Sequence, residues 1–266
     1  MSVRKEQSGR RSIQVEVEVP GTPEEVWQAI ATGPGVSSWF VPTRSDERVG
    51  GTISSHFGPG MDSDAAITAW EAPYRFAAES QGFAPGMPPM ATEWVVEARS
   101  GGTCIVRVVH SMFAATDDWD NQLESVESGW PSFFRILHLY LTEFRGQPCS
   151  MIQLMGLAHD GDQPAWNEFL AFLGLTGRGP GQAWSTPAGV PRLAGCVDQI
   201  GGGKEPYQLL RLQEPTPGVA FLNACGMGGQ VYVNLCFYLY GNSASAAVST
   251  QEPSWQAWMN QHFPMG

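Results

Sequence analysis

The pattern of apolar and polar positions predicts a half-buried strand close to the start of the chain. In the segment SIQVEVEVPG, residues 12–21, four aliphatic side chains alternate with Gln14, Glu16 and Glu18. A period of two residues places the two sets on opposite faces of a strand. We therefore expect one face of this strand in the core and the other in water.

The following segment, TPEEVWQAIATGPGVSSWF at residues 22–40, predicts a helix that ends early. Thr22 is a favourable N-cap, Pro23 suits the first helical position, and apolar residues recur at helical spacing. The Gly-Pro-Gly sequence that follows then stops the helix. Two adjacent aromatic residues, Trp39 and Phe40, come after this stop.

An antiparallel meander comes next. Strand-like runs are separated by turn residues, and Ser100-Gly101-Gly102 joins the last two as a hairpin. The run GFAPGMPPMA at residues 82–91 is a loop that either flaps over a cavity mouth or simply connects two strands. The predicted strands cover residues 50–58, 65–72, 74–82, 91–99 and 103–113.

A long amphipathic helix closes this half of the chain. Between residues 123 and 146, apolar side chains recur every three or four positions, which gives one broad apolar face. Pro131 lies inside this pattern and predicts a start or a kink near Gly129. The order of elements predicts an α+β fold in which a curved antiparallel sheet surrounds the long helix, with the pair Trp39 and Phe40 plugging or gating one end.

The second half of the chain reads as a shortened, degenerate copy of the first. A strand at 150–161 and a glycine-stopped helix at 163–177 precede four further strand candidates and a short terminal helix at 253–263. The copy lacks a long Gly-Trp helix, and residues 231–240 are almost continuously apolar, as in a strand buried on both faces. That strand suggests pairing with the first copy or a homodimer. The four strand candidates cover residues 193–200, 207–214, 218–225 and 230–241.

Charge supports a division of the chain and excludes one class of partner. Residues 149–266 contain seven acidic and four basic side chains, whereas residues 1–148 contain 19 and 11. We therefore predict one domain at 12–148 and a second at 149–266, after a flexible tail at 1–11. The net charge of −11 argues against nucleic acid as a ligand, since binding to phosphates needs a basic surface.

Sequence features also bear on location and redox state. No apolar run approaches the roughly 20 residues of a membrane span, and the basic N-terminus is not followed by the apolar core of a signal peptide. We therefore expect a cytoplasmic protein. The five cysteines form no CxxC pair, which predicts reduced thiols and neither a disulfide framework nor a zinc site.

The search for catalytic or cofactor motifs finds none with a recognised spacing. The sequence GGGK at 201–204 is followed by Glu205 where a phosphate loop needs Ser or Thr, so a turn is expected there. The histidines are scattered, and we predict no metal and no cofactor. The five histidines are His56, His110, His138, His159 and His262. His56 is expected in solvent, and His110 shares a strand face with Cys104.

His110 is the most informative of the five histidines. On the concave face of the sheet, a neutral imidazole at this position can form a hydrogen bond with a ligand carbonyl or hydroxyl group. The alternative is a buried histidine whose nitrogens are satisfied by neighbouring protein groups, which is the commoner arrangement.

Four segments in the correct order carry a resemblance to a known family. They are VPGTPEEVWQAIATGPGVSSWF (19–40), RVGGTISSHFG (48–58), GGTCIVRVVHSMF (101–113) and SGWPSFFRILHLYL (128–141). Together they resemble the START-like, helix-grip superfamily (SRPBCC), and within it the C-terminal domain of the activator of the heat-shock-protein-90 ATPase. The resemblance covers residues 12–146 and implies the helix-grip fold predicted above. It does not fix the function, because one fold hosts many activities.

The main hypothesis is a non-catalytic or weakly catalytic protein that binds a small hydrophobic molecule between the sheet and the long helix of the first domain. The resemblance also permits a chaperone-associated role, or a polyketide cyclase or aromatase activity with His110 as acid or base. The residues predicted to contact the ligand are Trp39, Phe40, Trp70, Trp94, Val96, Val106, Val108, His110, Trp130, Phe133, Phe134 and Leu137.

Overall fold

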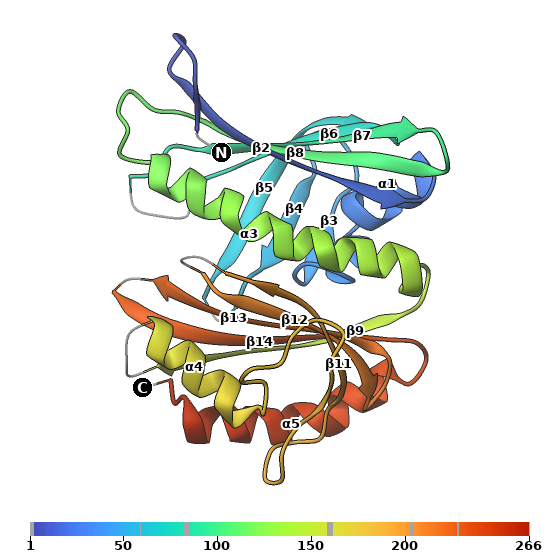
Figure 1. Ribbon diagram of the computed structural model, residues 1–266. Helices are drawn as coiled ribbons and strands as arrows, with labels where there is room; N and C mark the ends of the chain where they lie inside the picture. The colour runs from blue at the N-terminus through green and yellow to red at the C-terminus, as the bar shows by residue number, and fades with distance from the viewer. Residues whose placement is uncertain are drawn as a thin grey trace. The chain divides into compact units, whose positions relative to one another are not determined.

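The protein is described here by a computed structural model that covers residues 3–58, 60–81, 86–158, 162–202, 205–227 and 229–265. The chain forms two compact units, Met1–Arg145 and Gly146–Gly266 (Figure 1). The predicted division after residue 148 lies three residues further along. Each unit contains one antiparallel sheet and helices, so the predicted α+β class is confirmed.

The first unit contains an eight-stranded antiparallel sheet in the order β1-β2-β8-β7-β6-β5-β4-β3. Neighbours in the sheet are mostly neighbours in the sequence, except that β2 pairs with β8. The strands are β1 (Arg4–Lys5), β2 (Arg10–Pro20), β3 (Thr43–Ser45), β4 (Thr52–His56), β5 (Asp62–Glu71), β6 (Arg75–Ser80), β7 (Met90–Arg99) and β8 (Thr103–Phe113).

The two faces of this sheet differ as the alternating pattern predicts. On the outer face, Arg107 of β8 forms ion pairs with Glu16 of β2 and Glu97 of β7. The inner face contains buried side chains, among them Cys104 and Val106 on the same strand β8. At the hairpin between β7 and β8, the glycines at 101 and 102 adopt positive φ angles of 88° and 77°, which other residues rarely adopt.

Three helices accompany the sheet: α1 (Pro23–Ala31), α2 (Gly33–Ser37) and α3 (Asp120–Leu139), the last extended by the π-helical turn η1 (Tyr140–Phe144). The α1 helix begins with a complete capping box, in which Thr22 and Glu25 bond to each other's backbone. Helix α3 packs on the inner side of the sheet, against β2. The helix-grip arrangement is therefore present.

Helix α3 begins at Asp120, three residues before the predicted segment 123–146. Pro131 lies inside the helix, so of the two alternatives for this proline the helix start near Gly129 is wrong. The first turn of α3 is held by charge, because the buried Arg11 on β2 forms ion pairs with Asp120 at 2.7 Å and Asp117 at 2.6 Å. The acidic run before the helix is thus bound to the sheet.

The second unit contains a six-stranded antiparallel sheet in the order β10-β11-β12-β13-β14-β9 and two helices. Its strands are β9 (Cys149–Ala158), β10 (Ala183–Ser185), β11 (Ala194–Gly201), β12 (Tyr207–Glu214), β13 (Gly218–Met227) and β14 (Gln230–Tyr240). Helix α4 (Asp162–Phe172) packs against β13 and β14, and helix α5 (Ala244–His262) packs against β9 and β14.

The terminal helix is longer than predicted. The expected start at Pro253 was wrong, since α5 begins at Ala244 and Pro253 lies within it. Residues 244–252 are mostly small or polar, and their apolar stripe consists of Ala244, Ala247 and Val248, which pack on the core. Such small side chains give a weak helical signal in the sequence, so the packing of α5 on the sheet decides where the helix begins. The second unit therefore does contain a long C-terminal helix, contrary to the prediction.

Strand β14 is buried on both faces, as its continuous apolar sequence predicts. Leu235 and Phe237 belong to the core between the sheet and the helices. Tyr238 and Tyr240 alternate with them and are each 1% exposed. Two of the sequence motifs, His159 and the end of GGGK, lie outside the described residues, as do residues 82–85 of the predicted flap.

Candidate functional site

The inner face of the first sheet carries a row of aromatic residues that come from separate strands. Trp70 on β5 pairs with Phe76 on β6, and Phe76 pairs with Trp94 on β7. Trp94 in turn lies opposite Val108 on β8. Because directly opposed residues point to the same face, strand pairing alone aligns this row. The ring centroids of Phe76 and Trp94 are 6.1 Å apart.

Helix α3 adds a second set of rings to this row. Trp130 meets Trp94 edge to face, with centroids 5.2 Å apart, and Phe134 contacts both. Phe133, one residue earlier on the helix, is half-buried, whereas Trp130 and Phe134 are 6% and 3% exposed. The sheet and the helix therefore share one continuous aromatic cluster.

The segment after α2 connects this cluster to the surface. Trp39 is 1% exposed and donates its indole N–H to the carbonyl of Ala29 at 2.8 Å. The neighbouring Phe40 is half-buried and contacts Phe57, which is 42% exposed. Phe40 also meets Phe133 at 4.6 Å. The cluster thus runs from the buried core to an exposed ring.

A close approach of α1 and α2 sets the position of Trp39 and Phe40. A Cβ atom on Gly35 would lie 1.8 Å from the carbonyl oxygen of Gln28, so only glycine fits where the second helix crosses the first. Thr32 bonds to the backbone of both helices at this junction. The early end of α1 therefore turns the chain back and directs Trp39 into the core.

His110 lies at the centre of the inner face with both ring nitrogens engaged. Its Nε2 atom accepts the indole N–H of Trp130 at 2.9 Å, and its Nδ1 atom is 2.9 Å from the hydroxyl oxygen of Thr92, the residue opposite it on β7. Because Nε2 accepts, the ring proton lies on Nδ1 and is donated to Thr92. The planes of the His110 and Trp130 rings are nearly parallel, at 19°.

Burial keeps the His110 ring neutral. Desolvation lowers the pKa of this histidine from 6.5 to about 4. A neutral ring with both nitrogens bonded to the protein has no lone pair or proton left for a substrate in this arrangement. Its geometry is that of a group that orients the Trp130 indole.

The structure brings most of the predicted site residues together. The seven residues in direct ring contact are Trp39, Phe40, Trp94, His110, Trp130, Phe133 and Phe134. Trp70 joins them through Phe76, and Val96, Val106, Val108 and Leu137 are buried in the same unit.

Four residues of the cluster were not predicted: Trp27, Phe57, Phe76 and Thr92. Trp27 and Phe76 lie on apolar faces that the sequence shows, but only the pairing of β5, β6 and β7 places Phe76 in the row. Thr92 is identified only by its register opposite His110.

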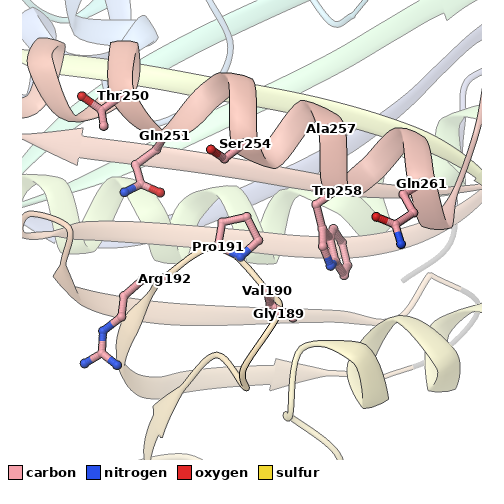
Figure 2. A pocket seen from close by; sticks show the side chains of 10 residues that line it. All are labelled: Gly189, Val190, Pro191, Arg192, Thr250, Gln251, Ser254, Ala257, Trp258 and Gln261. Carbon is pink, nitrogen blue, oxygen red and sulfur yellow. The ribbon is translucent and has the colours of Figure 1, made fainter.

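A separate groove lies on the outer side of α5 in the second unit (Figure 2). It has a volume of about 510 Å³ and is bounded by the loop Gly189–Arg192 and one side of the helix. Its only charged lining residue, Arg192, forms an ion pair with Glu214 at 2.7 Å. The remaining polar lining groups are the hydroxyls and amides of Thr250, Gln251, Ser254 and Gln261.

Two further classes of site were sought across the described part of the chain. Among those residues, no group of three or more His, Cys, Asp or Glu side chains is arranged to hold a metal ion. The described helices also include none with the length and hydropathy needed to cross a bilayer. The exposed His56 pairs with Asp62, in line with its predicted position in solvent.

Similarity to solved structures is spread over both units. The structure titled DynU16, "a putative protein in the dynemicin biosynthetic locus", is 18% identical, with 93% of this chain and 95% of that chain covered and a TM-score of 0.43. The di-domain ARO/CYC BexL from the BE-7585A biosynthetic pathway is 14% identical, with 96% and 99% covered and a TM-score of 0.45. The Aha1 dimer from Colwellia psychrerythraea is 22% identical, with 50% and 96% covered and a TM-score of 0.42. With such identities and scores, these likenesses have no bearing on what the chain binds.

The sequence comparisons concern the first unit. A comparison with curated proteins gave no match. Residues 20–142 match the family model described as "Activator of Hsp90 ATPase homolog 1-like protein". This range contains α1, α2 and the aromatic residues of the cluster described above. The first unit is therefore a helix-grip domain similar to the activator of Hsp90 ATPase homolog 1-like family, and the resemblance inferred from its sequence motifs is confirmed.

Proposed function

We propose that the first unit binds a small hydrophobic molecule between its sheet and α3, at the aromatic cluster. The observation that carries this proposal is the continuity of the cluster from core to surface. Trp94 and Trp130 are buried, Phe40 and Phe133 are half-buried, and Phe57 is exposed. Such a continuous series of rings from the core to the surface suits a ligand that enters between sheet and helix.

Electrostatics favour an uncharged ligand. The one titratable ring within the cluster, His110, is neutral at physiological pH because its pKa lies at about 4. The ion pairs of Arg107 with Glu16 and Glu97 lie on the outer face of the sheet. The charge of the buried Arg11 on β2 is already paired with Asp117 and Asp120. A charged ligand would therefore lose its hydration at this cluster without gaining an opposite charge.

The state of His110 also favours binding over catalysis. An acid or base must reach the proton that it transfers, within hydrogen-bond distance. Both nitrogens of His110 are instead bonded to Trp130 and Thr92. The role that we propose for His110 is to hold the indole of Trp130 in place.

Ligand binding is tested first by native and denaturing mass spectrometry of the freshly purified full chain. A small-molecule adduct that is lost on denaturation supports the proposal and gives the chemical class of the ligand. The second test is titration with the neutral fluorescent probe N-phenyl-1-naphthylamine. Trp130→Ala and Phe133→Ala are expected to weaken its binding by about tenfold, as the loss of a large buried contact does.

The controls separate loss of the site from loss of the fold. Tyr74→Ala removes an aromatic residue that is 53% exposed on a turn of the same unit, and it should leave probe binding unchanged. Far-UV circular dichroism checks that each variant is folded, and Phe133→Ala is the milder change because Phe133 is only half-buried. Unchanged binding in folded Trp130→Ala and Phe133→Ala would count against the proposed site.

The family match favours a second candidate, a role with an Hsp90-type chaperone. It rests on the description of the family whose model matches residues 20–142. The test is the ATPase rate of an Hsp90 chaperone with and without the full chain. An increase that saturates with added protein supports this role, and an unchanged rate together with no co-purification removes it.

A further inference from the structure

The ring of Phe40 lies over a face of the Trp130 indole. The two ring planes differ by 20° and their centroids are 5.4 Å apart, which is an offset stacked arrangement. Two other neighbours meet Trp130 differently, since Trp94 and Phe133 approach at 85° and 67°. The hydrogen bond to His110 and the edge-to-face contact with Trp94 together hold the indole in place. Phe40 therefore covers a flat surface whose orientation is set by the protein.

Phe40 is attached to a rigid frame but is itself half-buried. Its neighbour Trp39 is anchored by the bond to the carbonyl of Ala29. The turn is closed by Ser37, whose hydroxyl accepts the backbone N–H of Thr43 at 2.9 Å. Because the backbone on either side is held, the indole can be uncovered here only by movement of the Phe40 side chain.

A series of ring contacts links this position to the surface. Phe57 meets Phe40 at 5.7 Å with the planes at 83°, and Phe57 is 42% exposed. Phe133 closes the other side of Phe40 at 4.6 Å. Phe40 is thus the ring between the exposed end of the cluster and the buried indole.

We propose that Phe40 occupies the face of Trp130 on which a planar aromatic ligand stacks, so that the ligand and Phe40 compete for one position. This inference rests on the proposed binding function and names the chemical class of its ligand. An indole contains two fused rings, and the single ring of Phe40 covers only part of it. An uncharged ligand with two or more fused aromatic rings matches the indole better than Phe40 does, whereas a saturated ring system of similar volume cannot stack.

The test compares 2-naphthol with decahydro-2-naphthol, which has the same carbon skeleton without aromatic rings. Their dissociation constants for the full chain are measured by calorimetry. Phe40→Ala and Phe40→Leu are expected to tighten binding of 2-naphthol by about tenfold or more. In the wild type Phe40 covers the indole in most molecules, and the apparent affinity is lowered in proportion to the small fraction in which the indole is uncovered. Leucine keeps apolar volume at this site and guards against a folding defect in the alanine variant.

Tyr74→Ala is the control. It removes an aromatic residue that is 53% exposed on a turn of the same unit and lies outside the cluster. Binding of 2-naphthol to Tyr74→Ala should stay within about twofold of the wild type, as expected when no stacking face is uncovered. The ¹⁵N–¹H signal of the Trp130 indole, assigned by its absence in Trp130→Phe, should shift on adding 2-naphthol.

The possible results separate this inference from the function on which it rests. If Phe40→Ala tightens binding of 2-naphthol and of decahydro-2-naphthol equally, the variant only enlarges the site. That result would overturn the proposed competition for a stacking face. Unchanged 2-naphthol affinity in both Phe40 variants, with probe binding still dependent on Trp130 and Phe133, would overturn this inference and leave the proposed binding function intact. Absence of binding of every compound to the wild type and the Phe40 variants would overturn both.

Discussion

Replacing His110 with glutamine is expected to remove a pH dependence of stability from the first unit. Glutamine can reproduce both hydrogen bonds of the histidine, because its amide oxygen accepts from Trp130 and its amide nitrogen donates to Thr92. It has no proton to gain in the accessible pH range. His110→Gln therefore changes the titration while the local hydrogen bonds can be kept.

The magnitude follows from the pKa of the histidine in the two states. Burial lowers the pKa to about 4 in the folded chain, and the unfolded value is 6.5. A lowered pKa means that the unfolded chain takes up the proton first as the pH falls. Stability is therefore fully present above pH 6.5 and is lost between pH 6.5 and about 4. Between pH 7 and pH 5 the loss is about 2 kcal/mol, by proton linkage.

The assay is urea denaturation at pH 7, 6 and 5, followed by the indole N–H signal of Trp130, which reports on the first unit. The wild type should lose about 2 kcal/mol more than His110→Gln over this range, as linkage requires. Two carboxyl groups with lowered pKa values, Asp117 beside Lys5 and Glu214 beside Arg192, titrate at lower pH and are the same in both proteins. Parallel pH profiles for the two proteins would refute a neutral, buried His110.

The remaining predictions concern packing and thiol reactivity. Gly35→Ala should destabilise the chain by about 1–3 kcal/mol, measured by urea denaturation, because its Cβ would meet the carbonyl of Gln28. Gly129→Ala is the opposite control, since nothing lies within 4 Å of its Cβ inside α3, and it should stabilise by about 0.5–1 kcal/mol. If Gly35→Ala proves neutral, the close crossing of α1 and α2 is wrong. Burial raises the pKa of the Cys236 thiol to about 12, so this thiol should resist iodoacetamide at pH 8 and react only in urea. Peptide mass spectrometry would show this, and rapid modification of Cys236 in the native chain would contradict its burial.

Local pattern was sufficient for most elements of both units. Strand β2 follows from strict alternation and α1 from its N-cap and apolar stripe, and both are where the sequence places them. The starts of α3 and α5 were predicted less well, and for a shared reason. Their first turns consist mostly of polar or small residues, which give a weak helical signal; Arg11 binds Asp120 in one case, and small side chains such as Ala247 pack on the core in the other.

The candidate site divides in the same way. Aromatic residues at core-facing positions, such as Trp94 and Trp130, can be recognised from periodicity because burial of one face imposes the period. Their mutual contacts cannot be predicted from periodicity, because these contacts depend on strand register and on the placement of α3. Thr92 shows this most directly, because nothing in its own sequence neighbourhood indicates that it lies opposite His110.

The sequence by itself thus determined the class of fold, the family resemblance of residues 12–146 and the set of aromatic candidates, because these depend on local periodicity and short motifs. Only the tertiary structure decided what each candidate does. In the folded chain both nitrogens of His110 form hydrogen bonds, Trp39 is held by the carbonyl of Ala29, and Phe40 lies half-buried over the Trp130 indole. The physical reason is that hydrogen bonds and ring stacking act over a few ångströms between residues that are tens of positions apart in the chain.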